Sequence, residues 1–442
     1  MASPSLTSQG DKALSVPRSP WQRHPLWRHL RRPGLGWWAP AIILLVAAAY
    51  GVTGWLVLQI PFTATFATLV WAPSGIALYA VLRWGWTGVL GVMLGAIALS
   101  PMLHQTASFG MVTMFGNVLP AIIAAGFLPG AHFDRLFGDT KRVTRYLGVA
   151  VIGSTVTSAL IGATAVKYIG MPVPAGWLQV FAIWWAGDAM GVLIVTPALM
   201  AFGQLRRLRR SRQFVEFIAI ASSFAVIWYL LFAEILGRSV SLPLSYAAIP
   251  LVIWVALRFE QAVTVLVALI IILVAVLATA RGFGPFVLAE GVEQSYIFLH
   301  GYLAVIAVIA LYLSASASAG RRAMADLQHE IAEQRRIRAR LAATNELSGD
   351  AIITINQASQ ITAFNPAATS LFGYDLTDII GQPYAWLLPD SERDERQGLL
   401  DAFMMSGAHP LQTLHFKELR YRRKDGSEFN TLAAVGRVNS HA

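Results

Sequence analysis

Residues 302–336 read YLAVIAVIALYLSASASAGRRAMADLQHEIAEQRR, and the solvent that surrounds the chain changes within this stretch. Upstream of Ser318 the sequence is almost wholly apolar as far back as Trp37, and from Gly320 onward it is charged. A helix needs roughly 20 apolar residues to cross a bilayer, and the apolar region contains many such runs. The sequence therefore predicts a bundle of membrane-spanning helices followed by a segment in water.

The composition excludes an ordinary soluble globular protein, because 56% of the 442 residues are hydrophobic and only 13% are charged. The chain contains no cysteine, which excludes disulfides, thiolate metal sites and cysteine-based photochemistry. A net charge of +10 would suggest nucleic acid as the partner of a soluble protein. Here the basic residues lie in short loops between apolar runs, where they set membrane topology. We expect the lipid bilayer as a partner, and no nucleic acid.

Eight to ten transmembrane helices are expected, because three of ten candidate runs are short. The runs are about 38–60, 66–82, 86–103, 108–129, 146–168, 178–202, 214–236, 241–257, 261–280 and 296–315. One alternating set of linkers contains most of the cations: Arg23, Arg28, Arg31, Arg32, Arg83, Arg135, Lys141, Arg142, Arg145, Arg206, Arg207, Arg209, Arg210, Arg212 and Arg258. The other set carries only Lys167, Arg238 and Arg281. This bias places the first set in the cytoplasm, and an even number of spans returns Arg321 and Arg322 there, so both termini are expected in the cytoplasm.

Four regions follow from this pattern. Residues 1–36 are polar and basic and are expected to be a disordered cytoplasmic tail, not a cleavable signal peptide. Residues 37–318 form the transmembrane domain, residues 319–346 a helical linker, and residues 347–442 a C-terminal α+β domain.

The linker is expected to be one helix, because Arg321 to Glu346 contains neither Gly nor Pro. Leu327, Gln334 and Leu341 recur every seven residues, with Met324 and Ile331 alongside. Such a short heptad seam indicates a parallel homodimer through residues 321–346, and the alternative is a solvated amphipathic helix.

The C-terminal part alternates in short pieces. Ala351–Ile355 and Ile361–Phe364 read as strands, and Asn365-Pro366 begins a helix that Gly373 ends. His415–Arg423 and Glu428–Val438 read as two more strands. The Lys424-Asp425-Gly426 sequence between them is a hairpin signal, and we expect positive φ at both Asp425 and Gly426.

The membrane part resembles the MASE1 domain, the integral-membrane sensory module of bacterial histidine kinases and cyclic di-GMP enzymes. The resemblance depends on WAPSGIA at 71–77 followed by RWGW at 83–86, and on WWAGDAMG at 184–191 followed by Thr196-Pro197. It covers roughly residues 38–315. Gly85-Trp86-Thr87-Gly88 stands where that family often shows Trp-Pro-Gly. The resemblance implies a location in the bacterial inner membrane.

The C-terminal part resembles a PAS domain. The matching segments are DAII at 350–353, FNPAA at 364–368, LFGY at 371–374, IGQ at 380–382 and RKDG at 423–426. A PAS sheet has five strands in the order 2-1-5-4-3, and the resemblance implies that this chain lacks the last, central strand. We expect no cofactor, because haem would need an axial histidine that His409 and His415 are badly placed to supply, and a flavin adduct would need a cysteine.

Asp188 is the leading candidate for a functional residue. A carboxylate within a hydrophobic span is costly, and it persists where it faces the bundle interior with a partner or binds something. Gly187, Ala189 and Gly191 would let another helix approach closely. Asp188 is therefore either a ligand- or ion-sensing group or a buried acid that fixes helix packing.

A second candidate cluster comprises Trp71, Pro73, Ser74 and Gly75. Proline removes a backbone donor and interrupts the helix, which exposes carbonyls to a cation or ligand inside the bundle. The alternative is a kinked helix anchored by its Trp at the membrane interface. Asn117, Trp184 and Trp185 are further candidate lining residues for an unknown small ligand.

No catalytic motif is present, since we find no Walker loop, Ser/His/Asp arrangement, zinc spacing or paired carboxylates. The expected function is signal transduction: a stimulus would pass from the bundle through the linker helix to the PAS domain and to an output module absent from this chain. One alternative is a transporter or channel with a regulatory domain. Another is a fragment of a diguanylate cyclase, a phosphodiesterase or a two-component histidine kinase, so the question of enzyme activity stays open.

Overall fold

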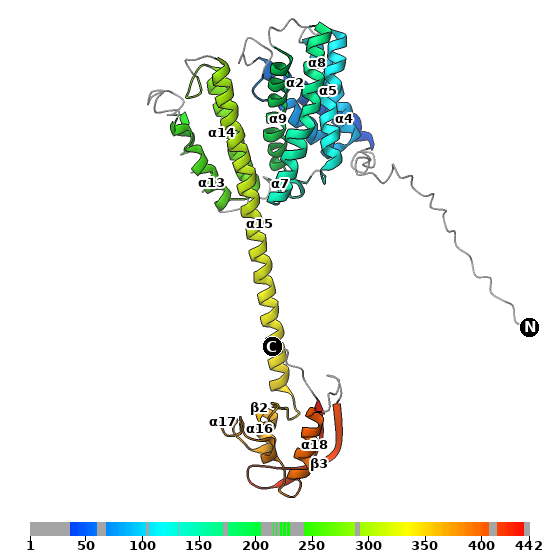
Figure 1. Cartoon of the computed structure of the whole chain (residues 1–442), viewed down its shortest axis with the longest axis vertical. Helices are drawn as coiled ribbons and strands as arrows, with labels where there is room; N and C mark the ends of the chain where they lie inside the picture. Colours follow the sequence, from blue (N-terminus) through cyan, green and yellow to red (C-terminus); the bar gives the residue numbers. More distant parts are fainter. Residues whose placement is uncertain are drawn as a thin grey trace, which may run out of the picture. The chain divides into compact units, whose positions relative to one another are not determined.

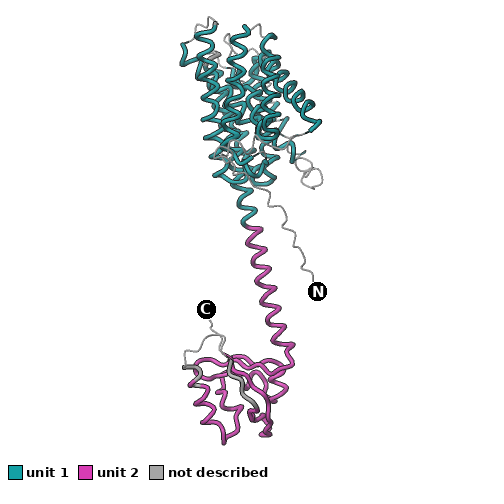
Figure 2. Tube along the Cα trace, turned by 90° about the vertical axis from the view of Figure 1, so that its right-hand side faces the viewer, with its two compact units in different colours: residues 1–323 teal, residues 324–442 magenta. Residues whose placement is uncertain are grey.

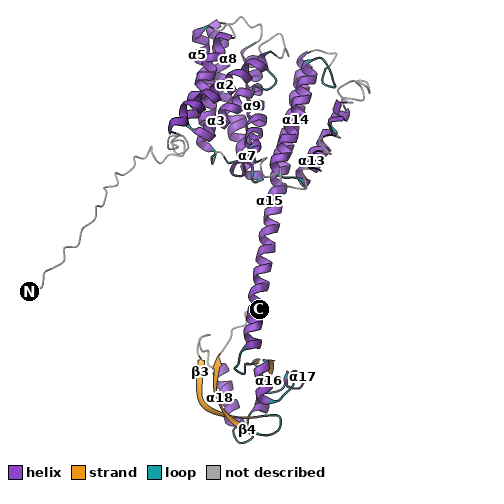
Figure 3. Cartoon of the chain, turned by 180° about the vertical axis from the view of Figure 1, so that it is seen from behind, coloured by secondary structure: helices purple, strands orange, loops and turns teal. Residues whose placement is uncertain are grey.

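The computed structural model divides the chain into two compact units, residues 1–323 and 324–442 (Figure 2). Helices build the first unit, and the second combines short helices with strands (Figure 3). The residues whose structure is described are 36–59, 68–102, 106–130, 132–170, 176–204, 215, 218, 222, 224–226, 228–229, 243–287, 292–405 and 413–436.

Each described apolar run of the first unit forms a helix, because a backbone in lipid must satisfy its own hydrogen bonds. In chain order the elements are η2 (Gly36–Trp38), α2 (Ala39–Leu58), α3 (Ala72–Trp84), α4 (Trp86–Met102), α5 (Ala107–Phe127), α6 (Phe133–Phe137), α7 (Thr140–Tyr146), η3 (Leu147–Ser154), α8 (Thr155–Ala165), η4 (Val166–Gly170), α9 (Trp177–Phe202), α13 (Ala248–Arg258), α14 (Gln261–Ala280) and α15 (Val292–Leu347). The segments η3 and η4 are π-helical. Together α7, η3, α8 and η4 make one uninterrupted span.

Six helices among the described residues are long and apolar enough to cross a membrane, and two shorter apolar helices cover Trp86–Met102 and Pro243–Arg258. The predicted fold class, a polytopic helical membrane bundle with a C-terminal α+β domain, is confirmed. The predicted second span is the 13-residue helix α3, which follows non-helical residues Thr68–Trp71. The predicted span 214–236 lies mostly outside the described residues, so the count of ten stays a prediction.

The short helix α3 lies at the centre of the N-terminal helices, in contact with α2, α4, α5 and α9. Helix α14 packs against α9, and α13 lies next to α14 (Figure 1). Helix α2 carries one face of exposed apolar side chains. On this face Leu44, Leu45, Val52 and Leu56 are at least half exposed. A contiguous apolar face of this kind is unfavourable in water and favourable against lipid.

Three of the linkers that the charge pattern assigns to one side of the membrane meet at one end of the bundle. Arg321 donates to the carbonyls of Leu257 and Phe259 at 3.3 and 3.1 Å. Arg322 donates to the carbonyl of Gly138. The loops after α6 and α13 and the exit of α15 therefore share this end, which we call the basic end.

The second unit begins within α15 and continues with β1 (Ile353–Ile355), β2 (Ile361–Phe364), α16 (Pro366–Phe372), α17 (Leu376–Ile379), η5 (Tyr384–Leu387), α18 (Arg393–Met405), β3 (Thr413–Arg422) and β4 (Glu428–Gly436). Antiparallel pairing joins β1 to β2 and β3 to β4, which makes two separate two-stranded sheets in the described part of the chain. The predicted second strand is confirmed at both ends. The predicted first strand is wrong by two residues at its start, because Ala351 and Ile352 are not in a strand.

The hairpin turn between β3 and β4 differs from the expected one. Gly426 has a φ of +85°, whereas Asp425 has no positive φ. The Gly426 N–H donates to the Arg423 carbonyl at 3.0 Å, and the Arg423 N–H donates to the Ser427 carbonyl at 2.9 Å. This pattern is a type I turn followed by a left-handed glycine, in which only the glycine needs positive φ. The expectation of positive φ at Asp425 was wrong.

An aromatic and aliphatic core holds the second unit together. Phe364, Phe372 and Tyr421 are buried in it, and Tyr384 packs against it. The Tyr384 and Tyr421 hydroxyls share a hydrogen bond of 2.7 Å. Burial raises the pKa of both phenols, so this bond stays neutral at physiological pH.

Asn365 connects four segments of the second unit and is 2% exposed. Its Oδ1 accepts from the backbone N–H groups of Ala368 and Ile352, each at 2.9 Å, so it caps α16 and fixes the start of β1. Its Nδ2 donates to the carbonyls of Asp350 and Asn345 at 2.9 and 3.0 Å. The predicted start of a helix at Asn365-Pro366 is confirmed, and the Asn365 side chain also holds the end of α15.

Replacing Asn365 with Ala should destabilise the second unit by about 2–3 kcal/mol, because a cap is worth about 1 kcal/mol and the other bonds become unsatisfied. Thermal unfolding of the purified protein, combined with limited proteolysis after residue 347, measures the loss. Asp375→Ala is the matched control, since Asp375 occupies the cap position of α17 without a side-chain cap bond. Equal resistance of the Asn365 variant and the wild type would contradict the proposed role.

Candidate functional site

The buried carboxylate of Asp188 lies on α9 and is 1% exposed. The Ser74 hydroxyl, at the start of α3, donates to Asp188 Oδ1 at 2.5 Å. Ser158 on α8 places a second hydroxyl near the carboxylate. Oδ2 has no hydrogen-bond partner among the described residues. One carboxylate oxygen is therefore held by the protein, and the other is left without a protein donor.

Glycines on α9 allow the start of α3 to approach this carboxylate. A Cβ at Gly191 would lie 1.9 Å from the Trp71 carbonyl oxygen, and one at Gly75 would lie 2.3 Å from the Gly191 carbonyl oxygen. The Trp71 N–H donates to the Gly187 carbonyl at 2.9 Å. The two backbones thus touch along this contact, and any larger residue would separate them. The predicted close approach of another helix is confirmed at Gly191, whereas Gly187 faces the non-helical residue Thr68.

Two further hydrogen bonds hold α9 in register with its neighbours. The Thr196 hydroxyl donates to the Gly75 carbonyl at 2.9 Å. The Tyr146 hydroxyl donates to the Val192 carbonyl at 2.6 Å. Asp188, Val192 and Thr196 follow one another at intervals of four, so a single face of α9 carries the polar contacts.

A narrow cavity with a mixed polar and apolar lining adjoins the carboxylate, with room for about one water molecule. Its lining residues are Ser74, Leu78, Asn117, Pro120, Ala121, Ser154, Thr155, Asp188 and Val192. Ser154 ends the π-helical segment η3, and Thr155 begins α8. Pro120 lies inside α5 and has no N–H for the carbonyl one turn earlier.

The cavity presents several hydrogen-bond acceptors, and the Asn117 amide adds both an acceptor and a donor group. The hydroxyls of Ser154 and Thr155 donate to the carbonyls of Ala150 and Val151 of their own helix, at 2.8 and 2.6 Å. Their remaining lone pairs and Asp188 Oδ2 can only accept. Such a set of oxygens suits a hydrogen-bond donor, a proton or a small hard cation. No group of three or more His, Asp or Glu residues that could hold a metal ion occurs in the described ranges.

The structure brings together some of the residues predicted from the sequence and separates others. Ser74, Asn117 and Asp188 meet at the cavity. Pro73 is buried in the first turn of α3, and Trp71 is its half-buried N-cap residue. Trp184 packs its ring on Gly162, and the Trp185 indole donates to the Ile152 carbonyl at 3.3 Å. Neither of these two Trp residues lines the cavity.

Tyr50 on α2 is a site residue that the sequence analysis missed. It is completely buried, and its hydroxyl has no hydrogen-bond partner among the described residues. The hydroxyl lies near the Asp188 carboxylate and the Trp71 side chain. A lone Tyr within the apolar run 38–60 was the available signal.

His300 and Tyr296 on α15 were also missed, although both lie within a predicted span. The Tyr296 hydroxyl donates to the Thr68 carbonyl at 3.3 Å. His300 lies near the Leu69 backbone, its Nδ1 is 3.1 Å from the Tyr296 carbonyl, and its buried Nε2 has no hydrogen-bond partner in the described part. Residues Thr68–Trp71 are therefore in contact with α15 and with α9.

Two family models match this chain. A model for MASE1 matches residues 40–321, and a model for a PAS domain matches residues 349–440. The first match covers the membrane helices, including all of α3 and α9. The second covers every strand of the second unit.

Replacing Gly191 with Ala should force the start of α3 away from α9, because the new Cβ would overlap the Trp71 carbonyl. Overpacking of this kind costs about 1–3 kcal/mol, so the melting temperature in detergent should fall by several degrees. Gly301→Ala on α15 is the control, since a Cβ there meets nothing within 4 Å. An unchanged melting temperature for the Gly191 variant would show that the two backbones are not in contact.

Proposed function

The chain belongs to the MASE1 family and is a membrane sensory signalling protein with a PAS domain, and from this premise we propose how it carries a signal. A stimulus changes the packing of α3 against α9 at Asp188, and α15 relays the change to the PAS domain and to an output module outside this chain. The protein lies in the bacterial inner membrane with both termini in the cytoplasm, as the loop charges favour.

The observation that carries this proposal is the position of Thr68–Trp71 between the carboxylate and α15. Trp71 bonds to Gly187, next to Asp188, and the same segment continues into Ser74, which bonds to the carboxylate. Thr68 accepts a hydrogen bond from Tyr296 on α15. A change in the Ser74–Asp188 contact therefore has a short physical route to the helix that leaves the bundle.

The stimulus acts by binding one packing of the bundle better than another. A ligand shifts a conformational equilibrium only by its difference in affinity for the two states. The Asp188 Oδ2 at the cavity, unpartnered among the described residues, favours a small cation, a proton or a small hydrogen-bond donor as the species that makes this difference. The cavity volume of about one water is too small for larger organic solutes, and the appended PAS domain favours sensing over transport.

The relay continues through α15, which is one helix from Val292 to Leu347. All its residues from Arg321 to Leu347 are exposed, including Met324, Leu327, Ile331 and Leu341 of the heptad seam. An exposed apolar stripe at this spacing favours pairing with a second copy of the chain. The output module is a cyclic di-GMP enzyme or a histidine kinase of a two-component system, the partners that the family resemblance implies.

Replacing Asp188 with Asn in a chain fused to a reporter output should change basal signalling by about fivefold or more, the range of typical allosteric coupling. The carboxylate charge is lost while the side-chain shape is kept. Ser74→Ala should shift the output in the same direction, because it removes the donor to Oδ1. Thr113→Val is the control, since the buried Thr113 hydroxyl bonds only within α5. Normal expression with an unchanged output in both variants would refute a sensory role for Asp188.

Cysteine cross-linking tests the proposed dimer cleanly, because the chain has no native cysteine. Ile331→Cys lies on the heptad seam and should give a disulfide-linked dimer in oxidised membranes. Arg336→Cys lies on the opposite face of the same helix and should give much less. The yield of cross-linked dimer is measured on a non-reducing gel. Equal yields from the two positions would contradict the proposed dimer and favour a solvated single helix.

A further inference from the structure

A second cavity, separate from the Asp188 site, opens at the basic end of the bundle. It has a volume of about 440 Å³. Its lining residues are Leu128, Pro129, Arg135, Leu136, Lys141, Arg142 and Arg145. Four of these seven side chains are cationic, and the other three are apolar. We call this cavity the basic cleft.

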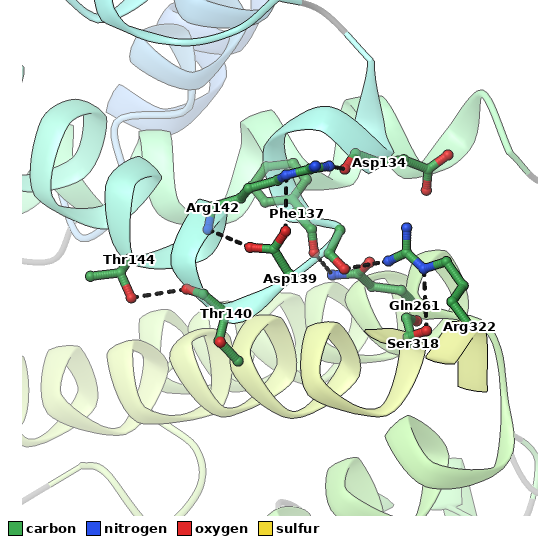
Figure 4. Close-up of polar contacts among 10 residues, drawn as sticks. Asp134, Phe137, Asp139, Thr140, Arg142, Thr144, Gln261, Ser318 and Arg322 are labelled. Carbon is green, nitrogen blue, oxygen red and sulfur yellow. Dashed lines mark hydrogen bonds and ion pairs between the residues drawn. The ribbon is translucent and has the colours of Figure 1, made fainter. Parts of the chain in front are cut away.

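The cations of the basic cleft lie on α6 and α7, two short helices that form a corner. Contacts with neighbouring helices hold this corner in place. Phe137 and Tyr146 are fully buried beneath it, with their ring centroids 4.9 Å apart. Gln261 on α14 donates to the Phe137 carbonyl at 2.6 Å, and Arg322 on α15 donates to the Gly138 carbonyl (Figure 4). The corner is therefore fixed on both neighbouring helices.

Only one cation of the cleft has an ion-pair partner in the part of the chain that the structure describes. Arg142 lies 3.0 Å from the Asp139 carboxylate and donates to the Asp134 carbonyl at 2.7 Å (Figure 4). No ion pair is seen there for Arg135, Lys141 or Arg145. Asp134 and Asp139 are the acidic residues of the corner, and Arg322 adds a fifth cation near Gly138. The corner carries an excess of positive charge.

Membrane topology alone requires cations in this loop but not their convergence on one cavity. Guanidinium groups match the oxygens of a phosphate in geometry and charge, and an ammonium group adds a further donor. The apolar lining residues Leu128, Pro129 and Leu136 suit the carbon skeleton next to such a phosphate. A basic pocket at the end of transmembrane helices is where a lipid headgroup is available.

We propose that the basic cleft binds a phosphate-bearing anion of the kind carried by an anionic phospholipid headgroup. Arg135, Lys141 and Arg145 supply the charge and hydrogen bonds, whereas Arg142 holds the corner in shape. The bound anion neutralises the excess charge next to the Gly138 carbonyl that anchors Arg322.

The test compares the full chain with the double variant Lys141→Gln, Arg145→Gln in nanodiscs. The discs contain phosphatidylcholine with or without phosphatidylglycerol of the same acyl chains, and native mass spectrometry counts the lipid retained. Each cation contributes about fivefold to affinity for an anionic surface, so the double variant should retain phosphatidylglycerol roughly 25-fold more weakly. Arg335→Gln, Arg336→Gln is the matched control, because it removes the same charge from exposed positions of α15.

Two further measurements keep the result interpretable. The charge-preserving variant Lys141→Arg, Arg145→Lys should retain the lipid, which separates lost charge from misfolding. The second measurement adds soluble glycerol 3-phosphate to the lipid-free protein in detergent and records the melting temperature. It distinguishes a soluble phosphate from a lipid headgroup as the bound species. Stabilisation of the wild type but not of the Gln variant would support a soluble source of the same chemistry. Equal responses of the wild type and the Gln variant to both probes would overturn the proposal.

Discussion

A non-helical backbone at membrane depth must find hydrogen-bond partners within the protein, and residues Thr68–Trp71 do so on two different helices. The Trp71 N–H uses the Gly187 carbonyl of α9, and the Thr68 carbonyl accepts from Tyr296 of α15. This requirement ties the start of α3 to both helices at once. The helix that follows this bonded segment, α3, is in contact with α2, α4, α5 and α9, so the segment holds a helix on which four others pack.

The same constraint explains why a carboxylate is tolerated in the bundle. Asp188 follows directly after Gly187, so the hydrogen bond that fixes Trp71 also places the Ser74 hydroxyl at the carboxylate. The small cavity beside the carboxylate is lined by residues of α3, α5, α9 and the junction of η3 with α8, so it depends on where α3 enters the bundle.

Much of this arrangement could be predicted from the sequence, and the remainder depends on long-range contacts. The apolar runs, the carboxylate, its glycines and the PAS-like strands are local patterns, so they were visible along the chain. The contact between Ser74 and Asp188 was not predicted, because the two residues lie 114 positions apart and no local pattern encodes their pairing. Tyr50 and His300 were missed for a related reason, since an isolated polar ring in an apolar run looks the same whether it faces lipid or a carboxylate. The turn at Asp425 was misjudged because an Asp-Gly pair fits two kinds of hairpin, and the extra loop residue decides between them.

A single helix can transmit a displacement only if it is held where the displacement enters and where it is delivered. Arg321 and Arg322 bond α15 to backbone carbonyls at the basic end, and Asn365 bonds the Asn345 carbonyl near its last turn. Between these points the residues from Met324 to Thr344 are exposed and contain neither Gly nor Pro, so nothing in the sequence favours a hinge. The acceptors in these bonds are backbone carbonyls, which every residue type carries. In the proposed relay, these two sets of hydrogen bonds are the points where α15 is attached to the bundle and to the PAS domain.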